Sequence, residues 1–148
     1  METKSCFFIG HRTAPNNIKE SLAEAIEKHI IEYGVTTFTV GHYGGFDSMV
    51  IGALREAKTR HANIKLYLLL PYHPTIQAVE TPKDFDGTLY PDGMETVPKP
   101  LAIVQANRKI IQNSDYLIAY CKFIGNTRNF VEFAQKREEK GLIKITLL

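Results

Sequence analysis

The sequence predicts an α/β fold, because short apolar runs alternate along the chain with amphipathic segments. The apolar runs contain few polar residues, which is typical of parallel strands that are buried on both faces. At 148 residues, the chain has the length of one domain and can bury a substantial core. We therefore expect residues 1–148 to form a single domain. Its predicted fold is a Rossmann-like three-layer sandwich, with helices on both faces of a parallel sheet of about five strands.

Two amphipathic segments in the first half of the chain predict helices. In Asn17–Tyr33, apolar residues recur at helical spacing, and Gly34 is a typical residue to end such a helix. From Ser48 to about Arg60, apolar residues again occupy one helical face. Three apolar runs around these helices predict strands: Ser5–Ile9, Thr37–Val40 and Lys65–Leu70.

Residues 71–101 interrupt this alternation. They contain six of the seven prolines, several acidic residues and the aromatic residues Tyr72, Phe85 and Tyr90. An irregular stretch of this length inside a small domain is usually a functional lid, an interaction surface or a disordered segment. The aromatic residues argue against disorder and offer surfaces on which a base can stack. A lid over a ligand and a contact between copies of the chain both remain open.

The alternation resumes after residue 101. We expect a helix at Ala102–Asn113, a strand at Tyr116–Tyr120, a helix at Arg128–Lys140 and a final strand at Lys144–Leu147. Within the first of these helices, Asn107 falls inside the apolar stripe. An amide facing a core needs hydrogen-bond partners. Asn107 therefore either binds a neighbouring loop or faces a ligand.

Composition excludes several classes of partner. The net charge is only +2 and the basic residues are scattered, which gives no strong sign of nucleic-acid or anionic-membrane binding. No apolar run has the length of a membrane span. Cys6 and Cys121 have neither disulfide nor metal spacing, and the histidines are also scattered. We expect a cytoplasmic protein with no metal and no cofactor.

The carboxyl ends of the predicted strands carry the residues best suited to a ligand. In an open parallel sheet, ligands bind beyond these ends, where the strand order reverses. Gly44 and Gly45 precede a helix, so their turn either holds a phosphate by its N–H groups or is a plain turn with Asp47 as the N-cap. Taken singly, Arg12 and Arg128 are typical of solvated loop side chains, but their shared edge favours an anion site, since Arg pairs well with phosphate oxygens. The candidate ligand-binding residues are Gly10, His11, Arg12, Gly41, Gly44, Gly45, Phe46, Asp47, Asn107, Arg108, Gly125, Asn126, Thr127 and Arg128.

Several of these segments resemble motifs of small bacterial SLOG-superfamily proteins. They are Gly10–Arg12, Val40–Asp47, Leu89–Glu95, Asn107–Tyr116 and Gly125–Ala134, in the order in which the family has them. The superfamily also includes the LONELY GUY phosphoribohydrolases, DprA-type DNA-uptake proteins and nucleotide-sensing domains of Thoeris antiphage effectors. The resemblance implies a Rossmann-like fold that binds a nucleotide or a nucleotide-derived signal at the strand tips. It implies no reaction for this small subgroup.

The chain departs from the LONELY GUY signature Pro-Gly-Gly-x-Gly-Thr-x-x-Glu, whose Glu is catalytic. Phe130 stands three residues after Thr127, where that Glu is expected, and Glu132 projects away from the predicted buried face of its helix. Asp47, His11 and His42 are the remaining candidates for an acid or base. The missing Glu favours binding over turnover.

The sequence thus leaves three hypotheses open. The first is a protein that binds, senses or sequesters a nucleotide-derived small molecule. The second is a hydrolase that cleaves an N-glycosidic or phosphate bond of a nucleotide. The third is an assembly protein with a vestigial pocket, and a homodimer or higher homo-oligomer is compatible with each of the three.

Overall fold

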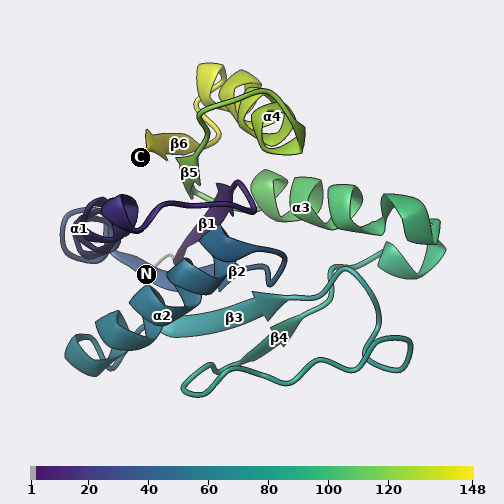
Figure 1. Cartoon of the computed structure of the whole chain (residues 1–148), viewed down its shortest axis with the longest axis horizontal. Helices are drawn as coiled ribbons and strands as arrows, with labels where there is room; N and C mark the ends of the chain where they lie inside the picture. The colour runs from purple at the N-terminus through teal and green to yellow at the C-terminus, as the bar shows by residue number, and fades with distance from the viewer. Residues whose placement is uncertain (1–2) are drawn as a thin grey trace.

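The computed structural model describes residues 3–148, which contain one sheet of six parallel strands. The strand order is β4-β3-β2-β1-β5-β6 (Figure 1). The strands are β1 (Lys4–Gly10), β2 (Val35–Val40), β3 (Lys65–Leu69), β4 (Gly87–Leu89), β5 (Tyr116–Tyr120) and β6 (Lys144–Leu147). The predicted Rossmann-like α/β fold is confirmed.

Helices cover both faces of the sheet. They are α1 (Lys19–Ile31), α2 (Gly45–Arg60), α3 (Ala102–Gln112) and α4 (Asn126–Glu139). Residues of α1 and α2 share one buried cluster with the sheet, and residues of α3 and α4 share the other. The two pairs are visible as separate groups in Figure 1.

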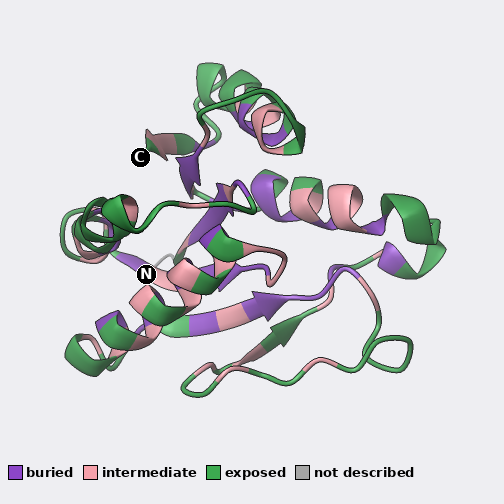
Figure 2. Ribbon diagram, in the orientation of Figure 1, coloured by how far each residue is buried: buried purple, intermediate pink, exposed green. Residues whose placement is uncertain are grey.

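Strand β1, in the middle of the sheet, shows why the strands are continuous apolar runs in the sequence. Cys6 and Phe8 belong to the cluster under α1 and α2, whereas Phe7 and Ile9 belong to the cluster under α3 and α4. Successive side chains of a strand point to opposite faces, and here each face is covered by helices. The middle of the sheet is therefore buried on both sides (Figure 2).

The order of the strands creates a switch point beside β1. The chain first builds β1 to β4 outward in one direction, and then returns to place β5 on the free side of β1. There, Gly10 at the end of β1 pairs with Tyr120 at the end of β5. The loops that leave these two ends diverge, which opens a crevice at the carboxyl edge.

Residues 71–101 contain one strand that the sequence did not predict. β4 is only three residues long, and Thr88 and Leu89 are exposed, so it shows neither an apolar run nor alternation. Contacts of the preceding residue, Asp86, with β3 fix its position. The N–H of Asp86 donates a 2.8 Å hydrogen bond to the carbonyl oxygen of Leu66, and Oδ2 of Asp86 accepts one of 2.8 Å from the N–H of Leu66. Lys58 forms an ion pair with the same carboxylate. Short-range sequence patterns contain no trace of these contacts.

The predicted helix boundaries also need correction. Helix α2 begins at Gly45 with Gly44 as its N-cap, so Asp47 lies in the first turn and is not the N-cap residue. Helix α4 begins at Asn126, two residues before the predicted start at Arg128. Helix α1 begins at Lys19 after a short 3₁₀ turn, Asn16–Ile18, and ends at Ile31.

Candidate functional site

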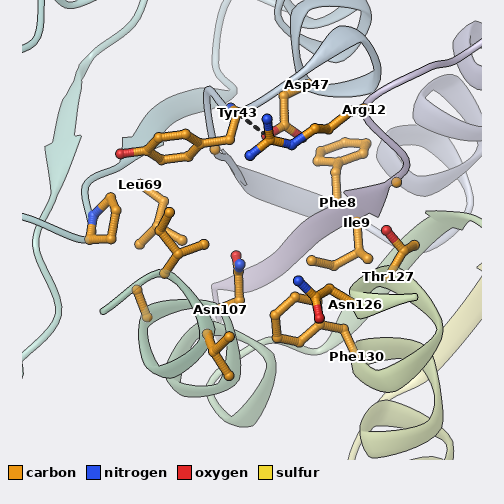
Figure 3. A pocket seen from close by; sticks show the side chains of 16 residues that line it. Phe8, Ile9, Arg12, Tyr43, Asp47, Leu69, Asn107, Asn126, Thr127 and Phe130 are labelled. Carbon is orange, nitrogen blue, oxygen red and sulfur yellow. Dashed lines mark hydrogen bonds between the residues drawn. The ribbon is translucent and has the colours of Figure 1, made fainter. Parts of the chain in front are cut away.

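A cavity of about 150 Å³ opens at the carboxyl edge of the sheet, beside the end of β1. Phe8 and Ile9 of β1, Leu69 of β3 and Phe130 of α4 give it an apolar floor (Figure 3). Polar side chains around this floor come from three loops or helix starts and from α3. The cavity therefore lies at the switch point, where the fold places ligands.

Four polar side chains at the cavity have no hydrogen-bond partner among residues 3–148. They are Arg12 in the loop after β1, Asn107 in the middle of α3, and Asn126 and Thr127 in the first turn of α4 (Figure 3). Arg12 and Asn126 are exposed, whereas Asn107 and Thr127 are half-buried. Of the two alternatives for Asn107, the structure favours the cavity over a bond to a neighbouring loop. These groups can donate hydrogen bonds to an oxygen-rich ligand.

Asp47 is the acidic group of this cavity. Its Oδ2 accepts a hydrogen bond of 3.0 Å from the N–H of Tyr43, which holds the turn before α2 together (Figure 3). Burial raises the pKa of Asp47 from 3.8 to about 6, although the Tyr43 N–H acts in the opposite direction. No ion pair joins Asp47 to Arg12 in the part of the chain that the structure describes. Near neutral pH, this carboxyl can therefore exchange a proton with a ligand.

The Gly44–Gly45 turn packs against the backbone of the β1–α1 loop. The N–H of Gly45 donates a 2.6 Å hydrogen bond to the carbonyl oxygen of Arg12. A Cβ on Gly45 would lie 2.6 Å from the same oxygen, and a Cβ on Gly44 would lie 2.8 Å from the Cα of Arg12. Gly44 also has a φ of 129°, which favours glycine. The two glycines thus permit a close approach of two loops, and the N–H of Gly45 is not free for a phosphate.

The first turn of α4 is the open helix start at the cavity. Its first N–H groups have no partner inside the helix, as at every helix N-terminus. No acidic residue lies in this turn, and no side chain caps it. Asn126 and Thr127 place this positive end of the helix dipole at the cavity wall.

His11 is buried away from the cavity and holds the β5–α4 loop. Its Nε2 accepts hydrogen bonds from the N–H groups of Lys122 at 2.9 Å and Phe123 at 3.4 Å. Its ring also stacks on Phe123 with centroids 3.6 Å apart. Burial and the charge of Arg128 lower the pKa of His11, so it is neutral at neutral pH.

Like His11, His42 does not line the cavity. The ring of His42 lies 4.3 Å from that of Tyr43, and burial lowers its pKa. Both ring nitrogens of His42 and the hydroxyl of Tyr43 are buried without a hydrogen-bond partner among the described residues.

The predicted candidates divide into two groups. The candidates at the cavity are Gly10, Arg12, Gly41, Asp47, Asn107, Asn126 and Thr127. The candidates placed elsewhere are His11, Gly44, Gly45, Phe46, Arg108, Gly125 and Arg128.

The two remaining arginines among the candidates have partners outside the cavity. The guanidinium of Arg108 lies 5.4 Å from the centroid of the Phe133 ring, on the side of α3 that meets α4. Nε of Arg128 donates to Sγ of Cys121 at 3.4 Å. Tyr43, conversely, lines the cavity but was not predicted to do so. The sequence signal that could have identified Tyr43 is its position inside the Gly41–Asp47 turn, whose other residues were candidates.

No protein-family model matches the chain, and no curated protein matches it. Within residues 3–148, no helix is long and apolar enough to cross a membrane. The same residues contain no group of three or more His, Cys, Asp or Glu side chains placed to hold a metal ion. What is established is a Rossmann-like α/β fold with an all-parallel sheet of six strands.

Proposed function

We propose that this protein binds a phosphorylated nucleoside or a related nucleotide-derived molecule in the cavity at the end of β1. The observation that carries the proposal is the convergence of Arg12, Asn107, Asn126 and Thr127 on one cavity without protein partners. Side chains that converge on open space from separate elements suit a ligand that satisfies them together. The location at the switch point of the sheet supports the same conclusion.

In this proposal, the phosphate lies against the first turn of α4. The N–H groups of that turn, the hydroxyl of Thr127 and the amide of Asn126 donate to its oxygens, and the Arg12 guanidinium neutralises its charge. Asn107 approaches the sugar hydroxyls from α3. Ile9 and Phe130 contact the apolar face of the sugar ring.

The sequence resemblance to SLOG-superfamily proteins supports the same class of ligand, since that superfamily binds nucleotides and nucleotide-derived signals at the strand tips. Sensing or sequestering such a signal requires binding without turnover. Phe130 fits this role because it lines the cavity floor and stands at the sequence position where the LONELY GUY signature has its catalytic Glu.

Binding should be measured by calorimetry with ribose 5-phosphate and a panel of nucleoside monophosphates. We expect Arg12→Ala to weaken binding by about 1.5–3 kcal/mol, the scale of a lost hydrogen bond to a charged group. Arg108→Ala is the matched control, because Arg108 is also exposed but lies outside the cavity. Equal affinities for wild type and Arg12→Ala, or equal losses in both variants, would contradict the proposal. Mass spectrometry of small molecules that co-purify with the native protein should identify the natural ligand.

The raised pKa of Asp47 favours a second function, which is acid catalysis of N-glycosidic bond cleavage. A carboxyl with a pKa of about 6 is close to the value that a general acid needs at neutral pH. This function predicts release of free base from nucleotides, at a rate that falls as pH rises above 6. Chromatography of nucleotides incubated with wild type and Asp47→Asn tests it. Equal base release by both proteins would exclude Asp47 as the acid.

A further inference from the structure

A second cavity, of about 350 Å³, lies under the irregular segment 71–101. Tyr72, His73 and Tyr90 form aromatic walls, and the buried side chain of Met94 lies at its floor. The rings of His73 and Tyr90 meet edge to face with centroids 5.3 Å apart. In Figure 1, the chain loops out beyond the edge of the sheet after β3, returns through β4 and then reaches the start of α3. The cavity is thus an aromatic site built by the loop.

The two cavities adjoin. Pro71 lines both of them, and the consecutive residues Ala102 and Ile103 of α3 line the second and the first respectively. Tyr43 of the first cavity also has a buried, unpartnered hydroxyl among the described residues. Burial raises the pKa of Tyr43, and the nearby hydroxyl of Tyr72 raises it further. Groups of the two cavities are therefore close enough to interact.

The first cavity alone is too small to enclose a whole nucleotide. A cavity of about 150 Å³ in an apolar core holds a molecule the size of benzene. Sites for whole small-molecule ligands usually measure about 300–1,000 Å³. The first cavity therefore encloses about one ring, so that a sugar-phosphate unit bound there extends beyond it, whereas both cavities together reach the size that a complete nucleotide requires.

We propose that the second cavity is the base subsite of the same ligand: a planar heteroaromatic ring stacks on Tyr72 and Tyr90 while its sugar-phosphate end occupies the first cavity. This inference rests on the proposed function. Aromatic side chains suit such a ring because every base has a π-face. Glu95 and Lys99 also line this cavity and supply an acceptor and a donor for the polar edge of the ring.

Two contacts join Lys99 to Tyr72. Nζ of Lys99 lies 5.9 Å from the centroid of the Tyr72 ring, and the Tyr72 hydroxyl donates to the Lys99 carbonyl oxygen at 3.4 Å. These contacts orient Tyr72 at the cavity wall. The ring of Tyr72, and not its hydroxyl, is the group that the proposal needs.

The experiment compares nucleoside monophosphates with ribose 5-phosphate on the full chain by calorimetry. We expect at least one of AMP, GMP, CMP and UMP to bind more tightly than ribose 5-phosphate. Tyr72→Ala and Tyr90→Ala should each weaken that nucleotide about 5- to 100-fold, the scale on which alanine substitution removes base stacking. Both alanine variants should bind ribose 5-phosphate with the affinity of wild type. Tyr72→Phe and Tyr90→Phe keep the rings and should retain the nucleotide affinity, with thermal melts to show that every variant is folded.

The outcomes separate this inference from the function on which it rests. If neither ribose 5-phosphate nor any nucleotide binds, both are wrong. If ribose 5-phosphate binds through Arg12 but no nucleotide binds more tightly, or the nucleotide advantage survives both alanine substitutions, only the base subsite is wrong. If the alanine variants instead change the sedimentation of the free protein and leave all affinities unchanged, the aromatic cavity is a contact between copies of the chain.

Discussion

The raised pKa of Asp47 predicts a specific dependence of stability on pH. A carboxyl whose pKa is higher in the folded than in the unfolded state stabilises the fold at low pH, and this contribution is lost as pH rises through the folded-state pKa. With 3.8 for the unfolded chain and about 6 for the folded chain, the full contribution is about 3 kcal/mol. Between pH 5 and pH 7.5, about 1.4 kcal/mol of it should disappear.

Asp47→Asn isolates this effect, because the amide oxygen can still accept the Tyr43 N–H while the side chain no longer titrates. The free energy of unfolding should be measured by urea titration for both proteins at pH 5 and pH 7.5. Burial lowers the pKa of the buried histidines, which affects stability with the opposite sign, but these histidines are common to both proteins and cancel in the comparison. We expect the variant to gain about 1.4 kcal/mol relative to wild type on going from pH 5 to pH 7.5. An identical pH dependence in the two proteins would refute the buried-carboxyl argument.

Two further predictions concern the loops around the cavity. Gly45→Ala should destabilise the protein, because its Cβ would lie 2.6 Å from a backbone oxygen. Gly52→Ala in the same helix is the control: its Cβ meets nothing within 4 Å, so it should stabilise the protein by about 0.5–1 kcal/mol. Chemical denaturation measures both variants, and a Gly45→Ala variant as stable as wild type would show that the two loops separate easily. His11→Ala should speed hydrogen exchange at the N–H of Lys122, because this N–H loses its acceptor, while His73→Ala at an exposed position should not. Because the pKa of His11 is lowered, the same contact should persist at neutral pH and weaken only as pH falls through this lowered pKa. Exchange of Lys122 that is insensitive to His11→Ala would contradict this role.

Local patterns in the sequence were sufficient for most of the fold. The apolar runs specify strands buried on both faces, and the helical periodicity specifies α1 to α4, because both patterns depend on neighbours within a few residues. Strand β4 escaped prediction because it is held by Asp86 through contacts with Leu66 and Lys58, which are distant in sequence. The start of α2 was misplaced because the preference of Asp47 for an N-cap position competes with loop packing around Gly44.

The candidate site was partly predictable for a related reason. Strand tips converge in any parallel sheet, so Arg12, Asp47 and Asn126 were expected at one edge, and a cavity joins them there. The position of Asn107 followed from its place in the apolar stripe of its helix. Sequence could not show that Arg108 turns toward Phe133, because the direction of a flanking side chain depends on how α3 meets α4.

The hydrogen bond from Gly45 to the Arg12 carbonyl has a consequence for how this protein can diverge. The hydrogen bond that joins the β1–α1 loop to the start of α2 uses only the backbone carbonyl of residue 12, so this bond does not depend on which side chain residue 12 carries. A change of charge at position 12 therefore keeps the backbone hydrogen bond that holds this loop. If the proposed ligand binds here, substitutions at this position can change its affinity while the backbone hydrogen bond stays the same.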